Sequence, residues 1–265
     1  MNAQFFTAWV EETARTITAD RDRLTALDAA IGDADHGTNL DRGFTAVREA
    51  LSASSPAGPG AVLILTGTTL IRKVGGASGP LYGTAYRHMG TTLTARAAQA
   101  VAGRAGTGLD STSGAVPGTG IEAPGPGTAG FTGTAGARDE AGPGGAPGDG
   151  DHMVMVTLAD LAAAFEAGLA AVCELGGAAE GDKTMVDALA PATRALAEAA
   201  RAGLKPEDAF DAALAAARAG ARATIPLQAR KGRASYLGER SAGHEDPGAA
   251  STVLLFTALR TVAGG

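Results

Sequence analysis

Apolar residues recur three and four positions apart through most of this 265-residue chain, and that spacing limits what the chain can fold into. It places apolar side chains along one face of an α-helix, whereas a half-buried strand would alternate with a period of two. Alanine, the strongest helix former, is abundant, and aromatic residues make up only 4% of the chain. The pattern predicts an all-α protein whose eight helices span 3–30, 38–53, 60–74, 80–100, 157–176, 185–202, 206–223 and 247–262.

Three prolines mark where predicted helices begin. Pro80, Pro206 and Pro247 each stand in a first helical turn, a position that tolerates the missing amide hydrogen. Asp246 directly precedes one of them, and a carboxylate there can accept hydrogen bonds from the free amides of the first turn. We therefore expect Asp246 to cap the last helix.

Residues 103–150 differ in composition from the rest of the chain. They contain 16 glycines and 5 prolines but only four large apolar residues, so they can bury too little surface to offset the entropy lost on ordering. We predict a flexible insertion within a single domain that spans residues 1–265. Two strings inside it, GPGTAG at 125–130 and GDGDH at 148–152, resemble known motifs by chance, because they lack the flanking elements or the third carboxylate that the chemistry needs.

Charge and cysteine content narrow the possible functions. The net charge is −6 and there is no basic run, which argues against nucleic acid or an anionic membrane as a partner. The single cysteine, Cys173, cannot form an internal disulfide, as is usual in a reducing compartment. The N-terminal stretch is acidic where a secretory signal is basic, and no apolar run reaches the length of a membrane span. These features predict a soluble cytoplasmic protein.

The segment LDAAIGDADHGTN, residues 27–39, concentrates carboxylates where the first two predicted helices meet. Asp28 falls in the last turn of one helix, and Asp33 and Asp35 follow Gly32 on the tight connection to the next. Carboxylates this close repel one another unless a cation neutralises them, and magnesium prefers oxygen ligands. The segment therefore predicts a magnesium site, and the alternative is an acidic helix end whose side chains are simply solvated.

His36, Gly37, Thr38 and Asn39 follow at once and open the second predicted helix. The first amides of a helix have no partner within it, and the N-terminal end of the helix dipole is positive, so a helix start can bind phosphate. Metal and phosphate would then share one pocket.

Two glycine-containing segments have the composition of turns that contact a ligand. GGASGPLYGT at 75–84 contains small residues that let a backbone approach a nucleotide closely, although a close-packed turn between helices would look the same. GDKTM at 181–185 resembles the end of a phosphate-binding loop but lacks the preceding strand. We therefore interpret Lys183 as a solvated turn residue.

A third segment, ARKGRASYLGERSAGHEDPGA at 229–249, is a long polar connection between two predicted helices. Connections of this kind in compact proteins are usually either functional or disordered. Arg233 is the candidate for clamping phosphate, because a planar guanidinium can hold two oxygens at once. We interpret His244 as a surface or capping residue rather than a proton carrier.

The strings IGDADHGTN, GGASGPLYGT, GDKTM and QARKGRASYLGERSAGHEDPGA, in this order, resemble the L subunit of dihydroxyacetone kinase over the whole chain except 103–150. The resemblance implies a single L domain, folded as an eight-helix antiparallel up-and-down barrel or bundle. It further implies ADP or ATP at one end, held through two Mg²⁺ ions whose ligands are Asp28, Asp33 and Asp35. Catalytic roles would fall to Arg233, Asp33 and Asp35. The implied nucleotide site consists of His36, Gly37, Thr38, Asn39, Ala77, Ser78, Gly181, Arg233, Asp246, Pro247 and Gly248.

The chain departs from the family's pattern at two places. A second glycine is usual where this sequence has Ala34, and we expect the methyl group to be tolerated there if the backbone is not left-handed. The large insertion at 103–150 is the other departure, and it leaves open the structure of the barrel rim near the fourth and fifth helices.

The resemblance also implies a division of labour between subunits. In the family, a separate K subunit binds the ketose covalently through a histidine, while the L subunit supplies the nucleotide. The phosphate comes either from freely exchanging ATP or from a phosphotransferase-system protein that rephosphorylates bound ADP. The motifs here do not separate these branches, name the ketose or decide whether the chain forms a homodimer. The alternative from another class is a non-catalytic module that binds magnesium-nucleotide or lipid and regulates a partner.

Overall fold

A computed structural model describes residues 1–106 and 155–264 of the chain. The chain divides into a unit formed by Met1–Val101 with Met153–Gly265 and a second unit, Ala102–His152. The first unit contains every residue of the site described below. No helix among the described residues is long and apolar enough to cross a lipid bilayer.

The described residues form helices and connecting turns, which confirms the all-α prediction. Eight α-helices and one 3₁₀-helix follow one another along the chain. Their bounds are α1 Ala3–Ile31, α2 His36–Ser54, α3 Pro59–Lys73, α4 Ser78–Gly106, α5 Leu158–Gly176, α6 Val186–Arg201, α7 Pro206–Ala223, η1 Arg233–Ser241 and α8 Pro247–Ala263.

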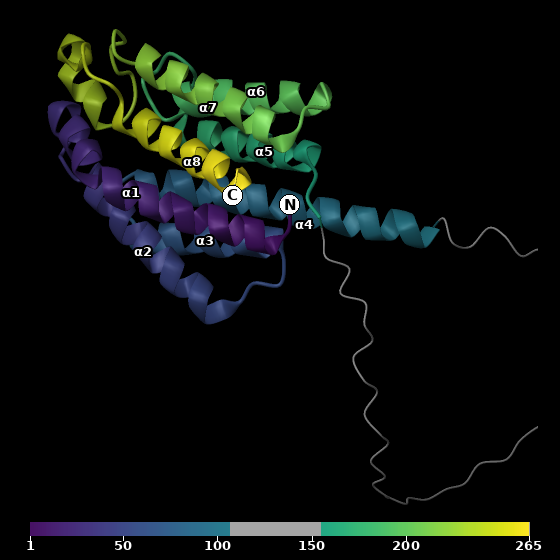
Figure 1. Cartoon of the computed structure of the whole chain (residues 1–265). Helices are drawn as coiled ribbons and strands as arrows, with labels where there is room; N and C mark the ends of the chain where they lie inside the picture. The colour runs from purple at the N-terminus through teal and green to yellow at the C-terminus, as the bar shows by residue number, and fades with distance from the viewer. Residues whose placement is uncertain (107–154, 265) are drawn as a thin grey trace, which may run out of the picture. The chain divides into compact units, whose positions relative to one another are not determined.

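The eight α-helices pack as neighbours in chain order and close a ring. Figure 1 shows α8, α1 and α2 lying side by side. Contacts join α1 to α2, α2 to α3, α5 to α6, α6 to α7, α7 to α8 and α8 back to α1. Close approaches at glycines supply the two remaining neighbours. A Cβ at Gly168 of α5 would lie 2.9 Å from Met89 Cγ of α4, so these two helices are in contact. The ring confirms the predicted eight-helix barrel.

Glycines let α3 and α4 approach each other unusually closely. A Cβ at Gly67 would lie 2.4 Å from the carbonyl oxygen of Gly83, and one at Gly60 would lie 2.6 Å from that of Gly90. The earlier residue of α3 faces the later residue of α4, so the two helices run antiparallel. No side chain fits between the backbones at these points.

Aromatic side chains from opposite helices fill the interior. Trp9 of α1 is fully buried, lies 5.8 Å from Phe165 between ring centroids, and donates its indole N–H to the carbonyl of Leu255 at 3.0 Å. Phe165 in turn stacks on Phe256 of α8 at 5.1 Å. Large buried rings joined in this way each remove a large apolar surface from water and help hold the ring of helices around one core.

The helix ends follow local sequence signals, with two departures from the prediction. Asp246 caps α8 by accepting a hydrogen bond from the amide of Ala249, as predicted, and Pro206 and Pro247 open their helices. However, α4 continues to Gly106 instead of ending at 100, so the first residues of the predicted insertion extend a helix. The rest of 103–150, with both motif-like strings, lies outside the described residues. The second departure is η1, a 3₁₀-helix within the segment that was predicted only as a long polar connection.

Candidate functional site

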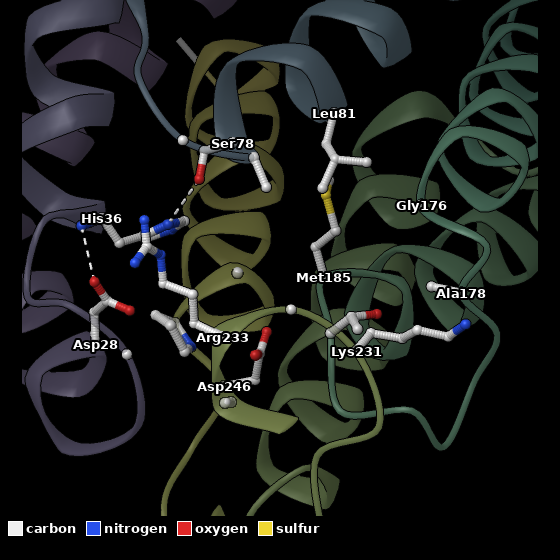
Figure 2. Close-up of a pocket in the computed structure, with 18 of the residues that line it drawn as sticks. Asp28, His36, Ser78, Leu81, Gly176, Ala178, Met185, Lys231, Arg233 and Asp246 are labelled. Carbon is white, nitrogen blue, oxygen red and sulfur yellow. Dashed lines mark hydrogen bonds between the residues drawn. The ribbon is translucent and has the colours of Figure 1, made fainter. Parts of the chain in front are cut away.

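A cavity of about 420 Å³ lies at the end of the ring where α1 meets α2 and where α8 begins. Figure 2 shows that its two sides differ in chemistry. Asp28, His36, Ser78 and Arg233 gather on one side, which we call the polar wall. The opposite side, which we call the apolar wall, includes Leu81, Gly176 and Met185. Val172, Leu175 and Val186 also line the cavity.

Three carboxylates of the polar wall converge as the sequence predicted. Asp28, Asp33 and Asp35 each offer an oxygen, and these oxygens lie within 4.8 Å of one another. Asp28 is buried, Asp35 is half-buried and Asp33 is exposed, so the cluster reaches from the protein interior to solvent. Oxygen ligands at this separation suit a hard divalent cation that keeps open positions for phosphate.

The buried carboxylate of Asp28 is fixed by the start of α2. Its Oδ2 accepts hydrogen bonds from the amides of Asp35 at 2.8 Å and His36 at 3.2 Å, which leaves Oδ1 for the cluster. Gly32 makes this arrangement possible, because a Cβ there would lie 2.0 Å from Asp28 Oδ1. The amides of Gly37 and Thr38, next along α2, make no hydrogen bond to the described residues. A helix start with free amides therefore adjoins the carboxylates.

Arg233 reaches the same cluster from the other end of the chain. Its Nη2 lies 3.1 Å from Asp33 Oδ2, and its side chain remains mostly exposed. Both groups keep contact with water, so the pair contributes little to stability and can separate readily. The guanidinium is thus held near the carboxylates while its other N–H groups remain available to an anion.

His36 connects the acidic cluster to the turn before α4. Its Nδ1 lies 3.0 Å from Ser78 Oγ, and its Nε2 lies 2.8 Å from Ser251 Oγ. Tyr82 extends the network to Ser251 at 2.7 Å and donates to the carbonyl of Gly248 at 3.0 Å. Burial lowers the pKa of His36, although the nearby carboxylates of the cluster oppose this effect. The imidazole is therefore neutral near pH 7 and acts here as a hydrogen-bonding link.

Asp246 forms the floor between the two walls. It is buried, its Oδ2 accepts a hydrogen bond from the amide of Ala249 at 2.7 Å, and its own amide donates to Thr224 Oγ1 at 2.9 Å. Burial raises the pKa of Asp246 to about 7, despite the Ala249 amide and the ammonium of Lys183, which favour the charged form. Near neutral pH this carboxyl group therefore exists partly in its protonated state.

The two walls together suit a ligand with an anionic end and a flat apolar end. The polar wall offers cation ligands, helix-start amides and a guanidinium, and these are the groups that bind magnesium and phosphate. The apolar wall presents the aliphatic side chains of Leu81 and Met185, with Lys231 on the same side of the cavity, and an aromatic base can pack against such a surface. The residues present thus fit a magnesium-bound nucleotide.

The sequence pattern of the DAK2 domain matches residues 30–129 and 145–261, which is most of the chain. This chain belongs to the DAK2 domain family. The match includes the acidic turn, η1 and the start of α8, so every part of the polar wall except Asp28 lies inside the matched residues.

Curated relatives of this DAK2 protein include subunits of kinases. The PEP-dependent dihydroxyacetone kinase, ADP-binding subunit DhaL, of Escherichia coli (strain K12) is 35% identical over 255 residues, which cover 96% of this chain and 94% of that protein. L-erythrulose 1-kinase of Mycolicibacterium smegmatis is 32% identical over 253 residues, covering 94% of this chain but only 34% of the longer relative.

Solved structures share the fold of this DAK2 protein. The dihydroxyacetone kinase of C. freundii in its native form matches with a TM-score of 0.58 at 23% identity, covering 97% of this chain and 34% of that one. The same kinase in complex with AMP-PNP and Mg²⁺ matches with a TM-score of 0.56, covering 96% and 33%. The DAK2 protein therefore corresponds to about one third of the C. freundii chain.

The structure brings most of the predicted site residues to the cavity. The predicted residues that line it are Asp28, Asp33, Asp35, His36, Ala77, Ser78, Arg233, Asp246, Pro247 and Gly248. Gly37, Thr38, Asn39 and Gly181 do not line it.

Gly37, Asn39 and Gly181 make contacts outside the cavity, whereas Thr38 is simply exposed. A Cβ at Gly37 would lie 2.1 Å from the carbonyl of Arg21, so this glycine lets α2 start against α1. Thr38 is exposed, while Asn39 is buried and accepts a hydrogen bond from Arg42 at 2.7 Å. The amide of Gly181 donates to Asp187 at 2.6 Å.

The apolar wall of the cavity was not predicted from the sequence. Leu81, Gly176 and Met185 come from three helix ends that are far apart in sequence, and each looks like an ordinary core or turn residue by itself. Lys231, next to the predicted Arg233, also lines the cavity. Usable signals existed for Lys231, which belongs to the same basic string as Arg233, and for Lys183 and Thr184, which belong to GDKTM and also line the cavity.

Two positions differ from what the sequence suggested. Ala34 has a φ of 62°, the left-handed conformation, so the condition under which we expected its methyl group to be tolerated is not met. The turn between α1 and α2 imposes this backbone although the residue carries a methyl group, so the turn is strained. Lys183 is not a solvated turn residue but is 1% exposed. Burial lowers the pKa of its ammonium group, while Asp246 and Asp187 oppose the shift.

Proposed function

We propose that this protein is the nucleotide-binding subunit of a dihydroxyacetone-type ketose kinase. It would hold a magnesium-bound adenine nucleotide and pass the terminal phosphate to a ketose carried by a separate K subunit. The observation that carries the proposal is the convergence of Asp28, Asp33 and Asp35 within 4.8 Å, beside a helix start and the guanidinium of Arg233. The name of the 35% identical relative, an ADP-binding subunit of dihydroxyacetone kinase, supports it.

The residues of the polar wall would divide the work. Magnesium-nucleotide, when bound, supplies the phosphoryl group and neutralises the charge that develops during transfer. Asp28, Asp33 and Asp35 hold the cations, and we propose two ions because three carboxylates exceed the charge of one. Arg233 exchanges its contact with Asp33 for phosphate oxygens and stabilises their charge. Transfer of phosphate needs mainly such positioning, so no covalent chemistry is required of this chain.

The apolar wall, His36 and the floor of the cavity would orient the nucleotide. The base packs on the apolar wall at Leu81 and Met185, across the cavity from the carboxylates. His36 stays neutral and holds Ser78, so the small residues at 77 and 78 keep their place beside the phosphates. The 246–248 turn closes the floor.

The test is reconstitution. The purified chain alone should phosphorylate no ketose, because its sequence contains no recognisable covalent carbonyl-binding site, and it should become active when a cognate K subunit and a phosphate donor are added. Dihydroxyacetone and erythrulose should both be offered, and sugar phosphate measured by mass spectrometry. Robust phosphorylation by the isolated chain with ATP would overturn the subunit assignment. Magnesium-dependent nucleotide binding without transfer in any reconstituted mixture would favour the regulatory module instead.

We further propose that ADP stays bound and is rephosphorylated in place by a phosphotransferase-system protein. The support is that the E. coli relative is named PEP-dependent and ADP-binding. Mass spectrometry of nucleotide released from freshly purified protein should then find ADP in near-stoichiometric amount. Nucleotide-free protein that is active with ATP alone and its K subunit would assign the chain to the ATP-exchanging branch.

A further inference from the structure

Lys183 is the only buried cationic side chain among residues 1–102 and 155–264. Its Nζ donates to the carbonyl oxygens of Thr224 at 2.7 Å and His244 at 2.5 Å, and more weakly to that of Ile225 at 3.5 Å. An ammonium group has three N–H donors, so these carbonyls satisfy a charge that would otherwise be costly to bury. The acceptors belong to the end of α7 and to the connection that leads into α8.

The backbone around Lys183 is held in a strained shape. Its φ is 62°, in the left-handed region that a lysine rarely adopts. Asp187 in the first turn of α6 braces the turn on both sides, accepting hydrogen bonds from the amides of Gly181 at 2.6 Å and Thr184 at 2.8 Å. Strain of this kind persists where the surroundings determine the conformation, so the fold specifically directs this lysine inward.

The contacts of Lys183 lead directly to the floor of the cavity. Thr224, whose carbonyl binds the ammonium, also accepts a hydrogen bond through its hydroxyl from the amide of Asp246 at 2.9 Å. His244, the second acceptor, lies two residues before Asp246. Lys183 therefore fixes the 244–248 turn at two points, and Asp246, Pro247 and Gly248 of that turn line the cavity.

We propose that Lys183 is a positioning residue for the nucleotide site, because its ammonium holds the 244–248 turn in the shape that binds magnesium-nucleotide. The inference rests on the proposed function. Lys183 itself lines the cavity. Three carbonyls already occupy its ammonium, so the ammonium acts through the turn and not through the ligand. The competing explanation is that Lys183 only adds stability to the fold.

Lys183→Met separates the two explanations, because it keeps most of the stem but removes the ammonium. Calorimetry with Mg-ADP should give a Kd at least tenfold above that of the full-length wild-type chain. Leu196→Ala is the matched control: it removes a fully buried side chain of α6, about 15 Å along the helix from the cavity, and lowers the Tm without touching the turn. Its Kd should stay within twofold of wild type, as should that of the exposed Lys205→Met.

A chemical rescue adds a readout that lost packing alone would not give. Lys183→Gly can adopt the left-handed backbone and leaves room for a replacement cation. Addition of n-butylammonium should restore Mg-ADP affinity in a dose-dependent way, whereas n-butanol should not. If Lys183→Gly binds Mg-ADP as tightly as wild type without any additive, the ammonium has no role and the proposal is overturned.

The outcomes also distinguish this proposal from the proposed function. If the wild-type chain binds no Mg-ADP, the proposed function fails. If wild type binds but Lys183→Met binds equally well, or if Leu196→Ala loses as much affinity, the positioning role is overturned. Should Lys183→Met not fold, Thr224→Val decides: it removes the hydroxyl that accepts the Asp246 amide but keeps the carbonyl that Lys183 contacts. We expect its Kd to rise several-fold, and an unchanged Kd would contradict the proposal.

Discussion

The acidic cluster and the floor of the cavity face the same space but are encoded differently. Asp28, Asp33 and Asp35 lie within eight consecutive residues, and the turn that joins two helices brings them together. Asp246 owes its position to Thr224 and Lys183, which come from other parts of the chain. The cluster is open to solvent on one side, whereas Asp246 is buried. Loss of a cluster residue should therefore damage binding but spare the fold, while changes at the floor should affect both.

The largest expected effect comes from the cluster. Asp33→Asn and Asp35→Asn each replace a charged ligand by a neutral one, and a hard cation binds such a ligand poorly. Magnesium-dependent ADP binding, measured by calorimetry, should fall by about 100-fold or more, while the Tm stays nearly unchanged. The matched control is Asp41→Asn on the second turn of α2, where the carboxylate accepts a hydrogen bond from Thr18 and lies outside the cavity. Unchanged ADP binding in both cluster variants would show that the three-aspartate site is wrong.

Arg233 belongs to the polar wall but comes from a segment far from the acidic turn in sequence. Its substitution therefore tests the function of the polar wall without changing the turn that carries Asp33 and Asp35. Arg233→Ala removes charge stabilisation that matters most during transfer, and kcat of the reconstituted kinase should fall by about 100-fold. The Kd for Mg-ADP should change far less, since Arg233 is mostly exposed and pairs with Asp33 in the nucleotide-free protein. Arg230→Ala, an exposed neighbour that does not line the cavity, serves as the control. Equal effects of both variants on kcat would remove Arg233 from the catalytic role.

Asp246 predicts a pH dependence of stability. Its pKa is about 7 in the fold against 3.8 in the unfolded chain, so between these values the folded protein holds a proton that the unfolded chain has released. The free energy of unfolding therefore falls as the pH rises from about 4 to 7, by on the order of a few kcal/mol. Asp246→Asn still caps α8 but does not titrate.

The measurement is chemical denaturation of the nucleotide-free protein at several pH values. Asp246→Asn should become progressively more stable relative to wild type as the pH increases through this window. Asp22→Asn, at a carboxylate whose side chain is 89% exposed, should show no such trend. A difference between Asp246→Asn and wild type that is constant with pH would contradict the assignment of a raised pKa to this group.

The smallest effect concerns the turn that carries the cluster. Ala34 is held at a φ of 62°, and glycine adopts this conformation without steric cost, so Ala34→Gly should raise the free energy of unfolding by about 0.5–1 kcal/mol. The same exchange at Ala215, an exposed position within α7, should lower it by about 0.5–1 kcal/mol. In thermal denaturation, Ala34→Gly should therefore raise the Tm and Ala215→Gly should lower it. Destabilisation by both substitutions would mean that the strain at Ala34 is already relieved.

The parts of the molecule that could be predicted from sequence are those that short segments encode. Helical periodicity located the eight α-helices, and the spacing of Asp28, Asp33 and Asp35 predicted their convergence. The sequence left the polar connection at 229–249 as either functional or disordered. Its nine-residue 3₁₀-helix was not predicted, because no period of apolar residues marks it.

Burial could not be predicted where it depends on several distant partners. From the sequence, Lys183 in a glycine-containing turn is expected to be solvated. Its ammonium can be buried because the carbonyls of Thr224, Ile225 and His244 accept its hydrogen bonds and offset the cost of removing the charge from water. The apolar wall could not be predicted for the same reason, since Leu81 and Met185 become neighbours only when α4 and α6 are packed. At Ala34 the surrounding turn decides the backbone conformation: it imposes a positive φ, although alanine by itself favours a negative one.

The glycine contacts between α3 and α4 have a consequence for mutational tolerance. Gly60 and Gly67 are two helical turns apart, as are Gly83 and Gly90, and each faces a backbone carbonyl at a distance that admits no methyl group. A saturation scan scored for soluble protein should therefore find four intolerant positions in two pairs with a spacing of seven. Neighbouring exposed positions such as Ala61 and Arg87 should accept most residues. In this barrel the least replaceable residues would then include some that have no side chain at all.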